Sequence, residues 1–125
     1  MEIQIILISD DHDYSYGVLS EITKLRHAVS VTEFDWNSAD PRARHEISGE
    51  DSHETPAIVM LDCGYKARAF ETIVDCAIAA KPRRPIECLV MRPPVDKAVY
   101  ATLAEKGVLM FDSAPLPISP AVAIH

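Results

Sequence analysis

Apolar and polar positions alternate along this chain in a way that predicts strands and helices in turn. Continuous Ile/Val/Leu runs are typical of strands covered on both faces, and period-two alternation is typical of half-buried strands. Five segments fit these patterns: residues 3–9, 28–34, 57–62, 86–91 and 108–111. Between them the sequence predicts four helices: residues 15–27, a short helix that begins near residues 40–41, a helix from residue 67 that stops before Pro82, and residues 95–106.

The ends of the predicted helices carry residues with capping chemistry. We expect Asp13 or Ser15 to cap the first helix, because a short polar side chain accepts hydrogen bonds from the free N–H groups of a first turn. Gly107 follows the fourth helix and suits the left-handed conformation of a C′ residue. We expect Ile78 on the inward face of the third helix and Ala98 on that of the fourth.

The alternation of strands and helices predicts a single α/β domain over residues 1–125. We expect a flavodoxin-like, doubly wound sheet of five parallel strands in the order 2-1-3-4-5, with strands 1 and 3 side by side. The tail predicts a fifth helix that begins at about Ser119 and is incomplete, with a proline-rich linker as the alternative. Val108 and Met110, together with apolar tail residues, should then be left partly exposed.

Composition limits the classes of function. Apolar residues make up 48% of the 125 residues and charged residues 25%, as in globular proteins. The formal net charge is −7, and the longest basic cluster, at residues 81–84, is interrupted by proline, so we expect no direct nucleic-acid binding by this domain. Three cysteines without CxxC spacing indicate reduced thiols in a cytoplasmic protein, and we expect no signal peptide and no membrane span.

Three aspartates follow two of the predicted buried strands. Asp10 and Asp11 come after the first strand, and Asp62 ends the third. The carboxyl ends of neighbouring parallel strands line the ligand crevice of such a sheet, so these side chains should converge. Carboxylates this close repel one another unless a cation lies between them. Mg²⁺ prefers oxygen ligands, so the cluster predicts a magnesium site and, through it, phosphoryl chemistry.

Other reactive side chains have simpler explanations. Asp10 with His12 is an alternative transition-metal pair, but such a site needs more imidazole or thiolate ligands, and we expect His12 to lie in an exposed loop. Cys63 beside Asp62 is expected to be structural, because neighbouring carboxylates disfavour a thiolate. Trp36, the single tryptophan, is expected to pack in the core.

The chain resembles the receiver domain of two-component response regulators. The resemblance rests on the run Ile-Ser-Asp-Asp-His at residues 8–12, on Leu-Asp at residues 61–62 and on the order of the elements. It implies that Asp62 accepts a phosphoryl group from a histidine kinase or a phosphotransfer protein, and that an output domain or partner protein responds. It also implies that Mg²⁺ is held by Asp10, Asp11, Asp62 and the backbone carbonyl of Gly64.

Two positions depart from the receiver pattern. Receivers carry Thr or Ser at the end of the fourth strand, where this chain has Arg92, and Lys after the fifth strand, where it has Ala114. Losing a charge-assisted hydrogen bond such as the one from that lysine costs about 1.5–3 kcal/mol. Arg92 either compensates, because guanidinium binds phosphate bidentately, or already neutralises the acidic pocket and locks one state.

Two hypotheses of function follow. The first is a signalling domain that accepts a phosphoryl group at Asp62, with Mg²⁺ on Asp10 and Asp11, and whose phospho-switching is impaired or atypical. The alternative is a pseudo-receiver, a protein-interaction or dimerisation module that works without phosphorylation. An enzyme such as a small hydrolase is disfavoured because no general base is evident near Asp62. We also expect a homodimer through the face of the fourth helix, fifth strand and fifth helix.

Overall fold

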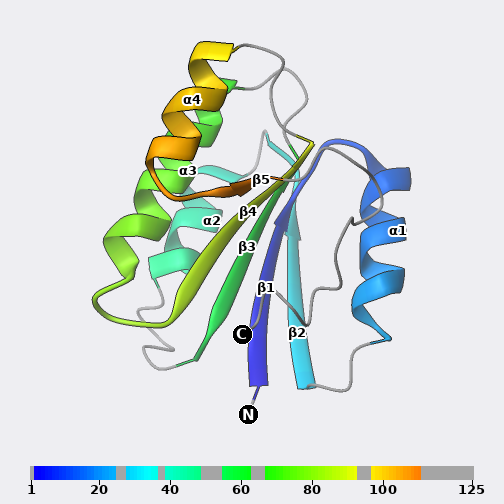
Figure 1. The fold of residues 1–125 in the computed structure, drawn as a ribbon. Helices are drawn as coiled ribbons and strands as arrows, with labels where there is room; N and C mark the ends of the chain where they lie inside the picture. The colour runs from blue at the N-terminus through cyan, green and yellow to red at the C-terminus, as the bar shows by residue number, and fades with distance from the viewer. Residues whose placement is uncertain are drawn as a thin grey trace.

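The centre of the molecule is a parallel β-sheet with helices packed against it (Figure 1). The computed structural model describes residues 2–24, 28–36, 39–48, 55–62, 67–92 and 97–110. The sheet has five strands in the order β2-β1-β3-β4-β5: β1 (Glu2–Ile8), β2 (Ala28–Phe34), β3 (Ala57–Asp62), β4 (Ile86–Arg92) and β5 (Leu109–Met110). Four helices lie in the described part of the chain: α1 (His12–Ile22), α2 (Ala39–Ser48), α3 (Ala67–Ala80) and α4 (Lys97–Glu105). All the strand pairs are parallel, which confirms the predicted flavodoxin-like α/β fold.

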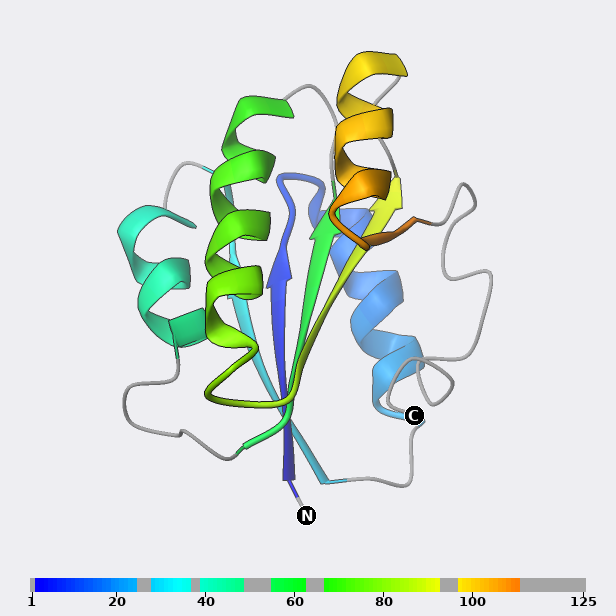
Figure 2. The same cartoon turned by 60° about the vertical axis from the view of Figure 1, so that its left-hand side comes forward.

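The helices form two layers, one on each face of the sheet. Figures 1 and 2 show α1 on one face and α2, α3 and α4 together on the other. Successive side chains of β1 alternate between the two faces. Ile5 shares a buried cluster with Val18 of α1, whereas Ile6 belongs to the cluster that contains Ile47 of α2 and Leu103 of α4. All residues of β3 are buried, as expected for a central strand covered on both sides.

Helix α1 begins earlier than the capping pattern predicted. It covers His12–Ile22 instead of residues 15–27, and neither Asp13 nor Ser15 is its cap. Asp11 is the N-cap, and its Oδ1 accepts a hydrogen bond from the backbone N–H of Tyr14 at 3.0 Å. Ser15 lies on the buried side of the helix with 7% of its surface exposed. The earlier start places an aspartate of the acidic cluster at the positive end of the helix dipole.

Helix α4 ends in a Schellman motif, and the motif explains why one prediction of exposure was wrong. Gly107 has φ of +80°, as expected for a C′ residue. Its N–H donates to the carbonyl of Ala104, and the N–H of Val108 donates to the carbonyl of Leu103. This turn brings Val108 back onto the core beside Leu103, so Val108 is only 8% exposed instead of partly exposed. Met110 is partly buried against the same cluster, as predicted.

Two helical residues predicted to face inward are exposed. Ile78 of α3 is 37% exposed, because the buried stripe of that helix runs through Ala77 and a neighbouring residue lies about 100° further around the helix. Ala98 of α4 is exposed as well. The buried residue of α4 is Leu103, and a residue five positions earlier lies about 140° away from it.

The C-terminal tail, with the fifth helix predicted from Ser119, lies outside the described residues. Phe111, predicted to end the fifth strand, lies outside them too. Among the helices that are described, none has the length and apolar character needed to cross a membrane.

Arg84 holds together the amino-terminal end of the sheet. It is 2% exposed, and its Nε and Nη2 both donate to the carbonyl of Thr55, at 2.9 and 2.6 Å. Nη1 donates to the carbonyl of Glu46 in the last turn of α2 at 3.1 Å, and Nη2 also donates to Oε1 of Gln4 in β1 at 2.9 Å. Burial lowers the pKa of Arg84, and the charge of Glu46 acts in the opposite direction. One buried guanidinium therefore joins β1, the end of α2 and the segment that leads into β3.

Replacing Arg84 by alanine should destabilise the fold strongly. The change leaves buried carbonyl oxygens of Thr55 and Glu46 without their donors, so we expect the free energy of unfolding to fall by about 3 kcal/mol or more. Urea unfolding followed by circular dichroism measures this difference. The neighbouring Arg83 is exposed and provides the matched control, because Arg83→Ala should change stability by less than about 0.5 kcal/mol. Equal losses in the two variants would contradict the role of Arg84.

Candidate functional site

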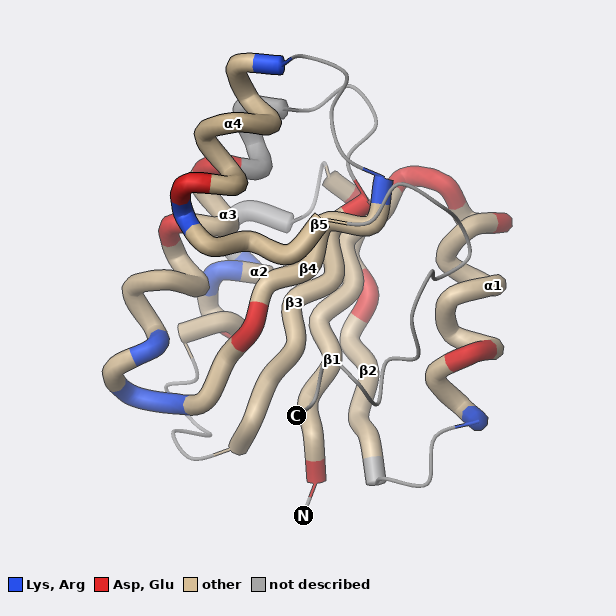
Figure 3. The backbone as a smooth tube through the Cα atoms, in the orientation of Figure 1, with Lys and Arg blue, Asp and Glu red and all other residues tan. Residues whose placement is uncertain are grey.

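A register shift at the end of β3 decides which residue of β4 faces Asp62. The two strands pair regularly up to Leu61 and Val90, and then Asp62 pairs with Arg92. Met91 is the extra residue in β4, as in a β-bulge. Without the shift, the apolar Met91 would stand opposite the aspartate. With it, a basic position is brought to the carboxyl edge of the sheet, close to the acidic positions that follow β1 and end β3 (Figure 3).

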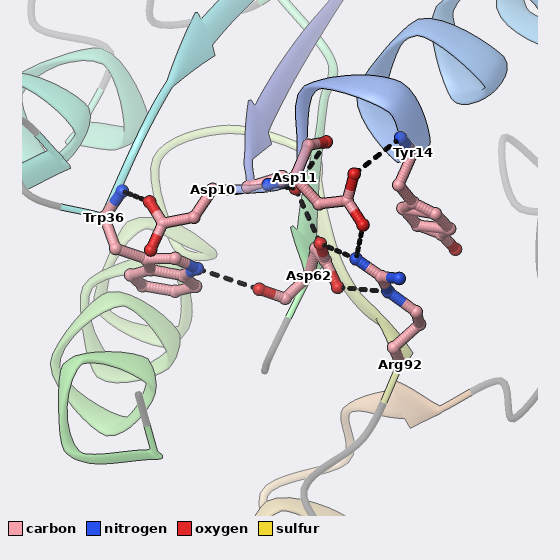
Figure 4. Close-up of polar contacts among 7 residues, drawn as sticks. Asp10, Asp11, Tyr14, Trp36, Asp62 and Arg92 are labelled. Carbon is pink, nitrogen blue, oxygen red and sulfur yellow. Dashed lines mark hydrogen bonds and ion pairs between the residues drawn. The ribbon is translucent and has the colours of Figure 1, made fainter. Parts of the chain in front are cut away.

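The guanidinium of Arg92 is the centre of the acidic pocket, by which we mean Ser9, Asp11, Tyr14, Asp62 and Arg92. Its Nε donates to Oδ1 of Asp62 at 2.7 Å, and its Nη2 donates to Oδ2 of the same carboxylate (Figure 4). Nη2 also donates to Oδ2 of Asp11 at 3.1 Å. This is the bidentate geometry that arginine forms with carboxylates, extended to a second acid. Two carboxylates from different strand ends are thus held by one internal cation.

Ser9 completes the environment of Asp62. The Ser9 hydroxyl donates to Oδ2 of Asp62 at 2.6 Å and accepts a hydrogen bond from the backbone N–H of Asp11 at 3.1 Å. Asp62 is 4% exposed and Ser9 is 5% exposed. A buried carboxylate is costly unless it is paired and hydrogen-bonded, and here both of its oxygens have donors.

Tyr14 supports Arg92 from the side of α1. The Arg92 guanidinium carbon lies 3.9 Å from the centre of the Tyr14 ring, which is a close cation–π contact. Burial raises the pKa of Tyr14 to about 12, with a further rise from the charge of Asp62, so the phenol stays neutral. Hydrogen bonds with Asp62 raise the pKa of Arg92, which keeps the guanidinium charged. The backbone N–H of Tyr14 and then Arg92 lower the pKa of Asp11.

Asp10 is directed away from Arg92 and toward β2. Its Oδ1 accepts a hydrogen bond from the backbone N–H of Trp36 at 2.8 Å. The indole Nε1 of Trp36 donates to the main-chain carbonyl of Asp62, also at 2.8 Å. Trp36 is 7% exposed and belongs to the core on the α2 side of the sheet, as predicted. In Figure 4, Asp10 and Trp36 lie on the opposite side of Asp62 from Tyr14 and Arg92.

The structure thus brings together part of the site that the sequence predicted. Asp11 and Asp62 lie around one cation, as the clustering argument requires, and Asp10 lies beside them in contact with Trp36. His12 is exposed, at the first position of α1 instead of in a loop. Gly64 and Ala114 lie outside the described residues, as does Cys63.

Sequence reasoning did not identify the roles of three residues in and around the pocket. Ser9 has a usable signal, since it is a hydroxyl residue immediately before the aspartate pair. Tyr14 and Trp36 have none, because their contacts with Arg92 and Asp62 depend on how α1 and the residues that follow β2 pack against the sheet.

The pocket as it stands does not fit a bound Mg²⁺. Within the described part of the chain, no three Asp, Glu, His or Cys side chains are grouped as a metal ion requires. The carboxylates of Asp11 and Asp62 already share Arg92. A divalent cation would have to displace this guanidinium before it could use their oxygens.

Comparisons of the chain with protein-family models, with curated proteins and with solved structures found no match. The proposed function therefore rests on the residues of the acidic pocket and on the topology of the sheet.

Acidification should weaken the part of the fold that Asp11 stabilises. Its pKa is lower in the folded protein than the ordinary value of 3.8, so its stabilising effect is present above pH 3.8 and is lost as the pH falls through the folded-state pKa. Asp11→Asn keeps an N-cap acceptor but removes the charge that pairs with Arg92. We expect the stability difference between wild type and Asp11→Asn, from urea unfolding at several pH values, to be largest near neutral pH and to shrink below pH 3.8. A difference that does not change with pH would contradict this assignment.

Proposed function

We propose that this protein is a receiver-like signalling domain that works as a protein-interaction module without phosphorylation, because Arg92 serves as the internal counter-ion of its acidic pocket. The observation that carries the proposal is the pairing of one guanidinium with both Asp62 and Asp11. In a receiver these acids would hold Mg²⁺ and accept a phosphoryl group. Here the charge that such a cation would supply is already provided by the chain.

Two features support the receiver-like part of this proposal. The sheet has the order that puts the ends of β1 and β3 side by side, and the acids lie at those ends. The sequence also has an aspartate pair after the first strand and a lone aspartate at the end of the third, which is the receiver pattern that it resembles. The position of Arg92 supports the phosphorylation-independent part, because it lies at the end of β4, where receivers carry the hydroxyl residue that follows the phosphoryl group. With a guanidinium there, a phosphoryl group on Asp62 lacks that hydroxyl partner.

The partners in this proposal are proteins. An output domain or a partner protein would read the conformation of the domain, in a cytoplasmic setting, and a second copy of the chain is a further candidate. Self-association through α4, β5 and the predicted fifth helix is supported by one large exposed apolar side chain in each described element, Tyr100 of α4 at 39% and Leu109 of β5 at 45% exposure.

A phospho-accepting switch is the second candidate, and the exposure of Arg92 favours it. The Arg92 side chain is 38% exposed, so it can leave Asp62 without opening the core. Asp62 would then be the acceptor, with a histidine kinase or phosphotransfer protein as donor, and the freed guanidinium would suit phosphoryl oxygens. This candidate requires Arg92 to move before the reaction.

Removing the charge of Arg92 should make the pocket bind divalent cations. Arg92→Gln leaves Asp11 and Asp62 without their counter-ion, so we expect Mg²⁺ or Mn²⁺ to bind about tenfold tighter or more than to wild type, the equivalent of one charge-assisted hydrogen bond. Calorimetry or Mn²⁺ relaxation measures the affinity. Lys106→Gln removes the same charge from the exposed pair with Asp75 and should bind as wild type does. No gain in Arg92→Gln would count against the counter-ion role.

A small phosphodonor separates the two candidate functions. We expect wild-type protein treated with acetyl phosphate and Mg²⁺ to keep its mass, because both oxygens of Asp62 are held by Arg92 and Ser9. Intact-mass spectrometry provides the measurement. Uptake of one phosphoryl group by the wild type, and its loss in Asp62→Asn, would support the phospho-accepting switch instead.

A further inference from the structure

Trp36 contacts Asp10 and the main chain of Asp62 at the same time. Its backbone N–H donates to the Asp10 carboxylate, and its indole N–H donates to the Asp62 carbonyl, both at 2.8 Å (Figure 4). Trp36 is 7% exposed and its indole bond is buried, so this bond does not compete freely with water. A shift of the main chain at Asp62 would therefore act directly on the indole hydrogen bond.

Helix α2 follows Trp36 in the chain and shares its core. Ala43 and Ile47 of α2 are fully buried and belong to the same buried cluster as Trp36. Arg42, also in α2, lies with its guanidinium carbon 5.8 Å from the ring centre of Phe34, at the end of β2. The last turn of the helix is fixed separately, because Arg84 donates to its carbonyl oxygens. Helix α2 is thus held at its last turn by a buried guanidinium and along its buried side by the core that contains Trp36.

The state of the pocket has a physical route to Trp36. Asp62 is 4% exposed, and without Arg92 its carboxylate would keep Ser9 as a donor but lose its cation. A buried charge without compensation is strongly unfavourable, so Asp62 would rotate toward solvent or draw in another cation. Either change takes place at the residue whose carbonyl accepts the indole N–H, which gives the pocket a direct connection to Trp36.

We propose that Trp36 is a positioning residue that couples the acidic pocket to α2, so that loss or displacement of Arg92 from Asp62 lowers the local stability of this helix. The inference rests on the proposed function, since it assumes that the domain has two states, one with Arg92 paired with Asp62 and one with Arg92 displaced. It makes α2 an element through which a partner protein would sense that state. The coupling depends on one donor, the indole N–H, which a phenylalanine lacks although it retains an aromatic ring.

Hydrogen exchange of single backbone amides tests the coupling, because it reports local stability in the intact protein. Four proteins form a double-mutant cycle: wild type, Arg92→Gln, Trp36→Phe and the double variant. We expect Arg92→Gln to speed exchange in α2 by about fivefold or more, the low end of the coupling found between linked sites. In the Trp36→Phe background the same change should alter α2 by less than about twofold, a loss of coupling that a structural role alone would not produce.

Exchange in α1 separates failure of this inference from failure of the proposed function. Arg92 also contacts Asp11 and Tyr14, so its removal should speed exchange at the start of α1 whether or not Trp36 is present. If α1 and α2 are both unchanged in Arg92→Gln, the pocket is not a counter-ion site and the proposed function fails. If α1 responds and α2 does not, or if α2 responds equally with Phe at position 36, the coupling through Trp36 is overturned.

A second measurement does not depend on the stability of Trp36→Phe. The chain has one tryptophan, so the indole N–H gives a single resonance in an NMR spectrum of labelled protein. We expect Arg92→Gln to shift this resonance and to speed its exchange with solvent. Lys106→Gln, which removes an equal charge far along the chain at the pair with Asp75, should leave it unchanged. An indole resonance that is the same in all three proteins would overturn the proposal.

Discussion

Two carboxylates held close together at neighbouring strand ends need a positive charge between them, and the architecture of this pocket follows from that constraint. Arg92 supplies the charge, and its fork of N–H donors reaches Asp62 and Asp11 at once. The short-range geometry depends on the register shift between β3 and β4, which exchanges Met91 for Arg92 opposite Asp62. A single extra residue in one strand therefore determines whether the acidic pocket is neutralised from within.

The chain uses two arginines of the β4 region in contrasting ways. Arg84 is 2% exposed and donates mainly to carbonyl oxygens, so it links α2, β1 and the segment that leads into β3. The Arg92 side chain is 38% exposed and pairs with carboxylates. A partly exposed ion pair is weakened by water and salt and can be exchanged for another cation, whereas buried backbone acceptors have no replacement donor. Arginine thus has a structural role at position 84, before β4, whereas at position 92, at the end of β4, it forms an ion pair that another cation can replace.

The acidic pocket is in contact with two separate parts of the fold. On one side Asp11 caps α1 and Tyr14 lies against the Arg92 guanidinium, so the counter-ion is tied to the start of that helix. On the other side Trp36 joins Asp10 and Asp62 to the core that includes α2. In the receiver pattern, a hydroxyl residue and a lysine carry the signal toward the fourth and fifth strands. The sequence resemblance puts Arg92 and Ala114 at those positions of this chain. The contacts of the described residues run from the pocket to α1 and to the core that contains α2.

Local patterns determined the alternation of strands and helices, the central buried strand at residues 57–62 and the placement of Asp11 and Asp62 at strand ends, because periodicity is a property of short segments. The sheet order was expected because five such strands allow the flavodoxin-like arrangement, and the structure confirms it. They also placed Arg92 at the end of β4 without deciding what it binds. The tertiary structure decided that Arg92 reaches Asp62 across 30 residues, that Ser9 does so across 53, and that the Trp36 indole meets the Asp62 carbonyl across 26. These contacts depend on strand register and on helix packing, which decide the side chains that face one another across different segments. A pattern within one segment does not contain that information.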